Sequence, residues 1–511
     1  MNVRSLRNAT AGMAAMAALL MSTALDAQTL RMAFSAEIEG LDEVYDPKPD
    51  TTFTGTVVYD MLARFHPETG EYSGMLADEI EQIDDMTWRM TLREDVTWHD
   101  GERFTADDVV YTLSFMSSPE ARFPSRTRWD FIEQVEKVND FEVIIHLNEP
   151  YSPFLARMAT GTPMYPAHVH GALENTATWG RAPIGTGPYR AVSVDSERGI
   201  VLERFEDYVV GPMPDFERIE IRQIPDAQTQ IAELLTGGID IFAAPNRSTI
   251  QAAEGLPGIN MSVGEDLSHI YMIFDAAGRS GHPAMGDIRV RQAILHAMDR
   301  DQLRRSLSRG GEESLALDRT CFPQQAVCPD GANPPAFDQD RARSLLAEAG
   351  YADGFDLTIH TLPPTQEMAQ AVAGYLRQVG IRASIETLSI PAYRAARADG
   401  AMAMQTAFWT HGGMPDAGYA LKFYFGVPSQ DYSGNPRLRE LSDIANQTSG
   451  EERMALVREA YDLMQDEALV LPVTGNPIVF LHNDSVRIDR TDRGGLFNTF
   501  GVSITNLAAG N

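Results

Sequence analysis

The sequence is poor in cysteine and in basic residues, and each shortage excludes a class of protein. Its 511 residues include 2 cysteines, and 42 Lys and Arg stand against 72 Asp and Glu, which gives a formal net charge of −30. A chain this acidic repels nucleic acid and anionic lipid head groups, so we exclude both as partners. Two cysteines with no histidine nearby also argue against a zinc site.

The chain lacks the marks of a membrane protein and of a common hydrolase. No internal stretch is long and apolar enough to span a bilayer. There is no Gly-x-Ser-x-Gly elbow, no His-Glu-x-x-His motif and no serine β-lactamase signature. His168 and His170 could hold a metal, but they lie in a stretch rich in Pro and Gly, where we expect both to be solvated. We therefore expect no catalytic residue, no metal and no cofactor.

The N-terminus carries the pattern of a secretory signal peptide. Arg4 and Arg7 precede the apolar run Ala11–Leu25, and small residues follow up to Ala27. We expect residues 1–27 to be a signal peptide that is cleaved after Ala27. No cysteine lies near that site, so the exported protein would have no lipid anchor.

The two cysteines, Cys321 and Cys328, are close in the sequence. In an oxidising compartment such a pair forms a disulfide. The chain-entropy estimate for so short a loop is about 2.5 kcal/mol of stabilisation. We interpret the disulfide as a staple on an exposed loop.

Alternating apolar and polar residues predict strands at 86–92 and 141–147 in the first half of the chain. The apolar residues of each stretch fall on one face, which is typical of a half-buried strand. A short helix is expected earlier, with Val57–Leu62 at its core.

Between these strands, two local signals predict a turn and a helix start. Asp100 and Gly101 form a tight-turn dipeptide. Thr105 and Asp108 have the spacing of a capping box, which opens a helix.

From about residue 270, strands alternate with helices. The expected strands and helices are 339–349 (helix), 355–361 (strand), 366–379 (helix), 381–388 (strand) and 401–409 (strand). A further short helix is expected after Pro391. This order predicts parallel strands with right-handed crossovers, and hence a second α/β domain.

The strand at 401–409 ends in Trp409 and is followed by a loop with two adjacent glycines. Pro415 and Asp416 suit the first turn of a helix, which we expect to begin there. Ligands of open α/β sheets bind at the carboxyl ends of strands, where this loop lies. The alternative is a surface turn with a packing tryptophan.

Several motifs follow one another along the chain, namely Trp88–Arg93, Val96–Gly101, Phe104–Tyr111, Ile184–Tyr189, Leu234–Asp240, Val290–Leu303 and Leu345–Phe355. Taken in this order, they resemble the peptide/nickel/opine family of extracellular solute-binding proteins, also called solute-binding protein family 5, which serves ABC importers. We expect some motif residues to shape the fold rather than bind ligand, namely Trp88, Asp100, Gly101, Asp108, Gly185 and Gly187.

The resemblance implies an α/β fold, a two-lobed periplasmic-binding-protein clamshell with an extra insert subdomain (type II-like, peptide-binding branch). Residues 28–265 would form lobe I, with the insert at about 50–185. Residues 266–481 would form lobe II, and 482–511 would return to lobe I. Two crossing strands, near 262–274 and near 478–484, would form the hinge.

The resemblance also places the ligand site. In peptide-binding members the segment that matches this loop carries a tryptophan and, three residues later, an aspartate that holds the α-ammonium of the peptide. Here Trp409 matches, but Gly412 replaces the aspartate. Burying an unpaired ammonium costs several kcal/mol, so we expect a ligand other than an ordinary peptide.

An anionic ligand is the alternative that the basic residues suggest. His411, and Arg126 or Arg128 of the insert, would meet a carboxylate or a phosphate; solvated surface charge is the other interpretation of the two arginines. The expected ligand-binding residues are Trp409, His411, Gly412, Met414, Asp416, Tyr419, Arg126 and Arg128.

For function, the resemblance implies the periplasmic substrate-binding component of an ABC importer and not an enzyme. A monomer would capture a peptide-like or other small polar organic solute between its lobes and deliver it to the inner-membrane permease. Closure would follow from higher ligand affinity of the closed form. A ligand-presenting sensor, a chaperone-like protein and a hydrolase on the same fold are the alternatives.

Overall fold

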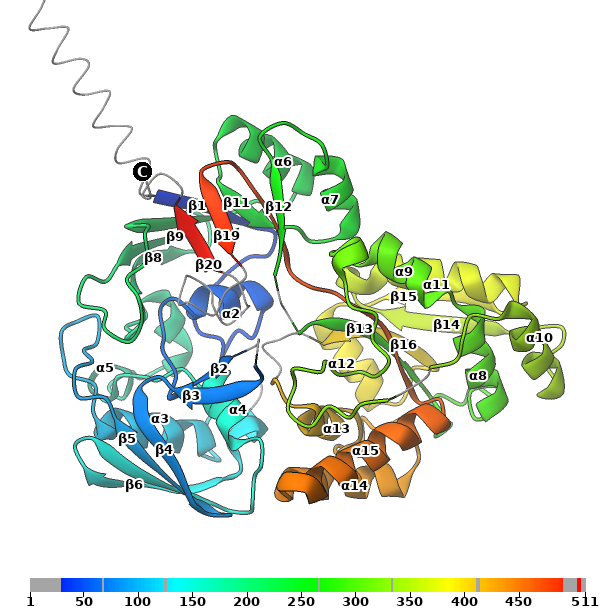
Figure 1. The fold of residues 1–511 in the computed structure, drawn as a ribbon, viewed down its shortest axis with the longest axis horizontal. Coiled ribbons are helices and arrows are strands. Elements are labelled where there is room, and N and C mark those ends of the chain that lie inside the picture. The colour runs from blue at the N-terminus through cyan, green and yellow to red at the C-terminus, as the bar shows by residue number, and fades with distance from the viewer. Residues whose placement is uncertain are drawn as a thin grey trace, which may run out of the picture.

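The computed structural model describes residues 29–66, 69–123, 126–264, 267–331, 334–409, 414–489 and 503–506. Two lobes lie side by side, and each is built on its own open sheet with helices packed around it (Figure 1). The expected two-lobed α/β clamshell is confirmed.

The first lobe is organised on a seven-stranded sheet in the order β12-β18-β11-β1-β10-β9-β8. Its strands are β1 (Thr29–Phe34), β8 (Tyr189–Asp195), β9 (Gly199–Arg204), β10 (Arg218–Gln223), β11 (Ile241–Ala243), β12 (Asn260–Val263) and β18 (Val479–His482). Central strand β1 runs parallel to β10 and β11. Helices α6 (Ala227–Thr236) and α7 (Arg247–Ala253) pack on this sheet through a shared apolar cluster.

Helix α2 (Pro49–Gly55) ends before the stretch that was predicted to be helical. The carbonyls of Val57 and Val58 instead accept hydrogen bonds from the backbone of Tyr189 (2.9 Å) and Gly187 (3.0 Å). A Cβ on Gly185 would lie 1.8 Å from the Val58 oxygen. The close-packed glycine loop therefore holds this backbone out of a helix. The predicted helix over Val57–Leu62 is wrong, whereas the backbone role of the two glycines is confirmed.

An insert within the first lobe carries a four-stranded antiparallel sheet, in the order β4-β5-β7-β6, and the hairpin β2–β3. Its elements are β2 (Ala63–His66), β3 (Glu71–Gly74), β4 (Ala77–Asp84), β5 (Thr87–Leu92), α3 (Ala106–Ser117), the 3-10 helix Arg126–Trp129, β6 (Ile132–Asn139), β7 (Glu142–Leu147), α4 (Phe154–Ala159), α5 (Ala167–His170) and the 3-10 helix Thr176–Arg181. Every second residue of β5 and β7 is buried, as the alternation predicted. Trp88 of β5 stacks on Phe154 of α4, with ring centroids 4.4 Å apart.

The turn and the cap predicted before α3 are confirmed. Gly101 has φ of +91°, a conformation that favours glycine. One oxygen of Asp108 accepts from the backbone of Thr105 (2.9 Å) and from the Trp98 indole (3.2 Å), and the other accepts from the backbone of Ala167 (2.9 Å). One buried carboxylate thus joins the start of α3, the turn and α5.

The expectation of a solvated histidine pair is wrong for one of the two residues. His168 lies at the surface, where its Nε2 is 2.7 Å from Asp100 Oδ2. His170 is fully buried, and its ring stacks on Tyr165 with centroids 4.3 Å apart. Burial lowers the pKa of His170 to about 4, so it is a neutral packing residue. No cluster of potential metal ligands occurs among the described residues.

The second lobe is organised on a five-stranded sheet in the order β15-β14-β16-β13-β17. Its strands are β13 (His269–Phe274), β14 (Asp356–Thr361), β15 (Arg382–Thr387), β16 (Met404–Trp409) and β17 (Val470–Gly475). Strand β14 runs parallel to both β15 and β16, which confirms the predicted parallel order, and β13 is antiparallel to its neighbours β16 and β17.

Helices surround this second sheet (Figure 1). They are α8 (Ile288–Ala297), α9 (Arg300–Leu307), α10 (Gln339–Glu348), α11 (Gln366–Gln378), α12 (Ile390–Ala398), α13 (Ala417–Phe425), α14 (Pro436–Gln447) and α15 (Gly450–Asp466), with short 3-10 turns at Gly311–Glu313 and Pro363–Thr365. Strands β19 (Val486–Asp489) and β20 (Ser503–Asn506) form a separate antiparallel pair.

The chain crosses between the lobes twice, and the two crossing segments are hydrogen-bonded to each other. The backbone N–H of Gly264 donates to Ile478 O, and that of Asn476 donates to Ser268 O, both at 2.8 Å. Strand β18 already belongs to the first sheet, so the return begins at Val479, earlier than the expected boundary at 482. Two adjacent crossing segments are the arrangement of a hinge, about which two lobes can rotate as rigid bodies.

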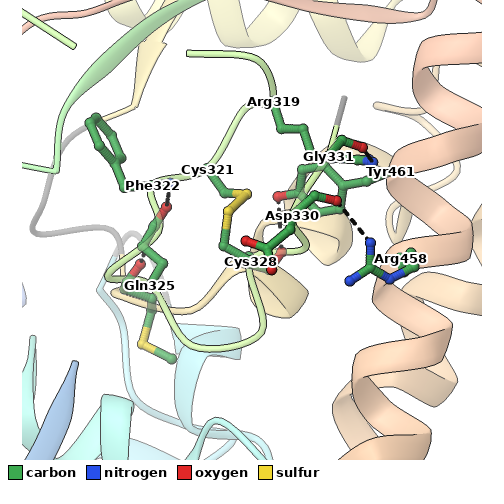
Figure 2. The surroundings of a disulfide bond; sticks show 11 residues. Arg319, Cys321, Phe322, Gln325, Cys328, Asp330, Gly331, Arg458 and Tyr461 are labelled. Carbon is green, nitrogen blue, oxygen red and sulfur yellow. Dashed lines mark hydrogen bonds between the residues drawn. A yellow bond between two sulfur atoms is a disulfide. The ribbon is translucent and has the colours of Figure 1, made fainter. Parts of the chain in front are cut away.

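The predicted Cys321–Cys328 disulfide is present (Figure 2). Its loop is anchored to α15, since the Arg458 guanidinium donates to Asp330 O (2.8 Å) and Arg319 pairs with Asp462 (2.7 Å). Cys321 is buried, so the loop is less exposed than expected. No helix among the described residues is long and apolar enough to cross a membrane.

Candidate functional site

Side chains from both lobes meet around Arg157, on helix α4 of the insert. The Arg157 guanidinium carbon lies 5.7 Å from the ring centre of Trp129, which is also in the insert, and 5.4 Å from that of Tyr419, on α13 of the second lobe. Close by, the Thr160 hydroxyl contacts the sulfur of Met414 at 3.6 Å. The first lobe is therefore in contact with the second at the very segment that follows β16.

Packing of α4 explains why an arginine lies in this position. Phe154 and Met158, on the same helix, are buried in the core of the first lobe. Arg157 is directed elsewhere, toward the second lobe, yet only 1% of its surface is exposed. Arg157 was not predicted from the sequence, although a single cation within the apolar segment FLARMA was a usable signal.

Arg128, one of the two arginines predicted to bind ligand, faces the same place. Burial lowers the pKa of its guanidinium, the charge of Arg157 lowers it further, and Tyr419 and Glu43 act in the opposite direction. Arg128 is thus brought together with Arg157 and Tyr419. Arg126 lies on the same 3-10 helix, and its side chain is outside the described residues.

One carboxyl group of the first lobe, that of Glu43, lies near these arginines. Burial raises its pKa to about 7, while the charge of Arg128 opposes this shift. The neighbouring Asp42 accepts a hydrogen bond from the Tyr165 hydroxyl at 2.8 Å. Burial also raises the pKa of Asp42, to about 6. The sequence contains no local pattern that would have identified either acid.

Asp416 is the N-cap of helix α13, which starts at Ala417, and the sequence predicted a helix start here. Its carboxylate accepts from the backbone N–H of Tyr419 (2.8 Å) and from the Arg453 guanidinium (2.8 Å), and the ion pair is almost fully buried. These partners belong to the second lobe itself. They give Asp416 a structural role, and its contact with a ligand stays a prediction.

Trp409 ends strand β16 and is 6% exposed. Its ring packs against Phe423 and Tyr424, with centroids 5.3 and 6.4 Å away, in the core of the second lobe. It lies directly before residues 410–413, which are outside the described residues and include the predicted site residues His411 and Gly412. Its role as a pocket wall stays a prediction.

Met414 is the first described residue after residues 410–413. It is buried and has φ of +109°, a conformation that costs about 1–3 kcal/mol in a residue with a side chain. The surrounding structure holds it in place, because the Gln325 side chain approaches Met414 O (3.5 Å) and also accepts from Phe322 N. Backbone strain of this kind clusters at ligand-binding segments.

The disulfide loop braces this segment from the other side. The N–H of Ala326 donates to Pro415 O (3.1 Å), and the N–H of Ala417 donates to Ala326 O (2.9 Å). Phe322 of the same loop is buried among apolar residues of the first lobe. The disulfide loop therefore supports the segment around Pro415, and it also contacts the first lobe directly through Phe322.

Further contacts between the lobes lie at the edge of the insert. The backbone N–H of Ser152 donates to Asn446 O (2.8 Å), and the Gln447 side chain donates to Glu149 (2.7 Å). Both second-lobe residues are on α14. The site around Arg157 is thus enclosed between the lobes: the first lobe contributes charged and aromatic side chains, and the second contributes Tyr419 and Met414.

Residues 71–431 match the family model described as "Bacterial extracellular solute-binding proteins, family 5 Middle". The oligopeptide-binding protein AppA of Bacillus subtilis is 27% identical over 314 residues, which cover 59% of this chain and 56% of that protein, so the chain aligns with little more than half of this relative. The dipeptide-binding protein of Escherichia coli is 25% identical over 90% of this chain and 91% of its own length.

A solved structure has the same fold. The periplasmic binding protein DppA from Helicobacter pylori, in complex with the peptide STSA, superimposes with a TM-score of 0.76 and 22% identity. The match covers 94% of this chain and 98% of that one.

Proposed function

Because the chain belongs to the family 5 bacterial extracellular solute-binding proteins, we propose that it is the periplasmic substrate-binding component of an ABC importer. It captures a small polar organic solute between its lobes and presents the loaded, closed form to an inner-membrane permease. Residues 28–265, with the insert at about 50–185, form lobe I, and the second lobe ends before the return of β18.

The enclosure of Arg157 between the lobes is the single observation that carries this proposal. A planar cation is buried beside aromatic rings from both lobes, at the segment that follows the carboxyl end of β16. A site of this kind binds ligand only if the lobes open and close, and the two adjacent crossing segments provide the hinge.

The class of solute is narrower than the family's range. With Gly412 in the position of the ammonium-binding aspartate, the proposed ligand is a peptide-like or other organic solute without an α-ammonium to anchor. A ligand-presenting sensor would need the same site; a chaperone-like protein or a hydrolase has no observation in its favour.

A thermal-unfolding screen of the purified protein tests the proposal. Peptides, opines, sugars, amino-acid derivatives, organic acids and metal chelates are each added at high concentration. A solute at 100 times its Kd is expected to stabilise the protein by about 2.7 kcal/mol. Tyr419→Ala should weaken this stabilisation because the ring faces the site. Tyr351→Ala, whose ring packs on Phe355 within the second lobe, is the matched control and should leave it unchanged.

The proposal is wrong if the whole panel leaves the unfolding temperature unchanged. Turnover of a stabilising solute by the purified protein would favour the hydrolase instead. Tight binding of unfolded chains without any small-solute effect would favour the chaperone-like protein.

A further inference from the structure

Arg157 is a buried cation that forms no ion pair with any of the described residues. Its Nε and Nη2 atoms are buried and have no hydrogen-bond partner among the described residues, and the ion pairs found in that part of the chain do not include it. Guanidinium groups do not lose their proton in proteins. A buried charge of this kind is strongly unfavourable unless a partner of opposite charge reaches it.

Two nitrogen atoms on one edge of the Arg157 guanidinium have no hydrogen-bond partner among the described residues. The rings of Trp129 and Tyr419 lie within cation–π distance of the guanidinium carbon, at 5.7 and 5.4 Å. The Tyr151 hydroxyl lies within hydrogen-bonding reach. The two atoms without partners, Nε and Nη2, are the parallel pair of donors that bind a carboxylate or phosphate in bidentate geometry.

Other arginines near Arg157 increase the positive charge of the site. Arg128 and Arg157 act on each other, and Arg394, an exposed residue of α12, also acts on Arg128. The negative charge of Glu43 acts on Arg128 and, more weakly, on Arg157, but Glu43 forms no ion pair within 4.0 Å with either arginine among the described residues. Its pKa of about 7 leaves it only partly ionised at neutral pH. One partly ionised acid does not neutralise both Arg128 and Arg157, while Arg394 is solvated.

We propose that Arg157, assisted by Arg128, binds an oxyanion group of the transported solute, so that the protein takes up acidic organic solutes carrying a carboxylate or a phosphate. This inference rests on the proposed transport function and specifies its substrate class. Arg157 would hold the oxyanion through Nε and Nη2, while the rings of Trp129 and Tyr419 hold the guanidinium plane in a fixed orientation. Lobe closure brings Tyr419 onto this plane and shuts out water.

Matched pairs of probes test the inference. Binding is measured by calorimetric titration for succinate against succinamide, for glutarate against glutaramide, and for glycerol 3-phosphate against glycerol. Wild-type protein is expected to bind acids and to reject the neutral partner of each pair; the pairs that bind show whether a carboxylate or a phosphate is preferred. Arg157→Gln should weaken acid binding roughly 10- to 100-fold, as expected for hydrogen bonds to a charged group.

Three variants separate this role from a structural one. Arg157→Lys keeps the charge and should recover part of the affinity. Arg128 lies on a different element, so Arg128→Gln should weaken binding of the same acids and tests the inference even if Arg157→Gln does not fold. Arg190→Gln, an exposed arginine paired with Glu203, should bind like the wild type. Circular dichroism and the unfolding temperature without solute confirm that each variant is folded.

The outcomes distinguish the inference from the function on which it rests. If the solutes that bind in the wider screen are neutral or cationic, and Arg157→Gln and Arg128→Gln leave their Kd unchanged, the inference is wrong while the transport function stands. If no solute of any charge binds the folded wild-type protein, both are wrong.

Discussion

Replacing Arg453 with methionine is expected to lower the free energy of unfolding by about 3–5 kcal/mol. Arg453 pairs with Asp416 at 2.8 Å, and the two side chains are 6% and 2% exposed. Methionine retains much of the volume but leaves the Asp416 carboxylate buried without its cation. Because Arg453 also donates to Ala445 O (2.8 Å), the change loosens α14 and α15 around the start of α13.

Urea-induced unfolding measures this effect, and a surface pair provides the matched control. Arg437 pairs with Glu459 at 2.7 Å, but these side chains are 38% and 43% exposed. Arg437→Met should therefore cost less than about 1 kcal/mol. The double variant Asp416→Asn/Arg453→Met should recover part of the loss. A cost for Arg453→Met as small as that of the surface variant would refute the structural role assigned to the buried pair.

The second large effect is expected at the cap of α3. Asp108→Ala removes the acceptor of two backbone N–H groups and of the Trp98 indole, which are left in or near the core of the insert. Each unsatisfied buried donor costs about 1–3 kcal/mol, so a total loss of about 3 kcal/mol or more is expected.

The adjacent acid supplies the control for this prediction. Asp107 is exposed and pairs with Lys137 at 2.8 Å on the surface. Asp107→Ala should change the free energy of unfolding by less than about 1 kcal/mol. Equal costs for the two substitutions in the same urea titration would show that the three hydrogen bonds of Asp108 do not stabilise the fold.

Local patterns in the sequence were sufficient to predict most elements. Alternation identified β5 and β7, the strand–helix order identified the parallel strands β14, β15 and β16, and capping and turn residues located the start of α3. The prediction of a helix over Val57–Leu62 was wrong because the backbone of this stretch is hydrogen-bonded to a loop more than a hundred residues away, which no local pattern reveals. Strand β18 enters the first sheet between β11 and β12 for a similarly non-local reason.

The site was less predictable than the fold. Arg128 and Tyr419 were expected there and are brought together, whereas Arg157 was missed. Burial of an arginine on a short apolar helix depends on which lobe the helix faces, and that follows from tertiary packing alone. Glu43 was missed for the same reason. Asp416, by contrast, was correctly assigned to a helix start from its position after Pro415.

A crystal structure of the protein with a solute that raises its unfolding temperature tests the central claim most directly. We expect density for the solute between the lobes, with an oxyanion group against Nε and Nη2 of Arg157 and with Tyr419 covering it from the second lobe. Density for the solute on the outer surface, or contacts with one lobe only, would contradict capture between the lobes.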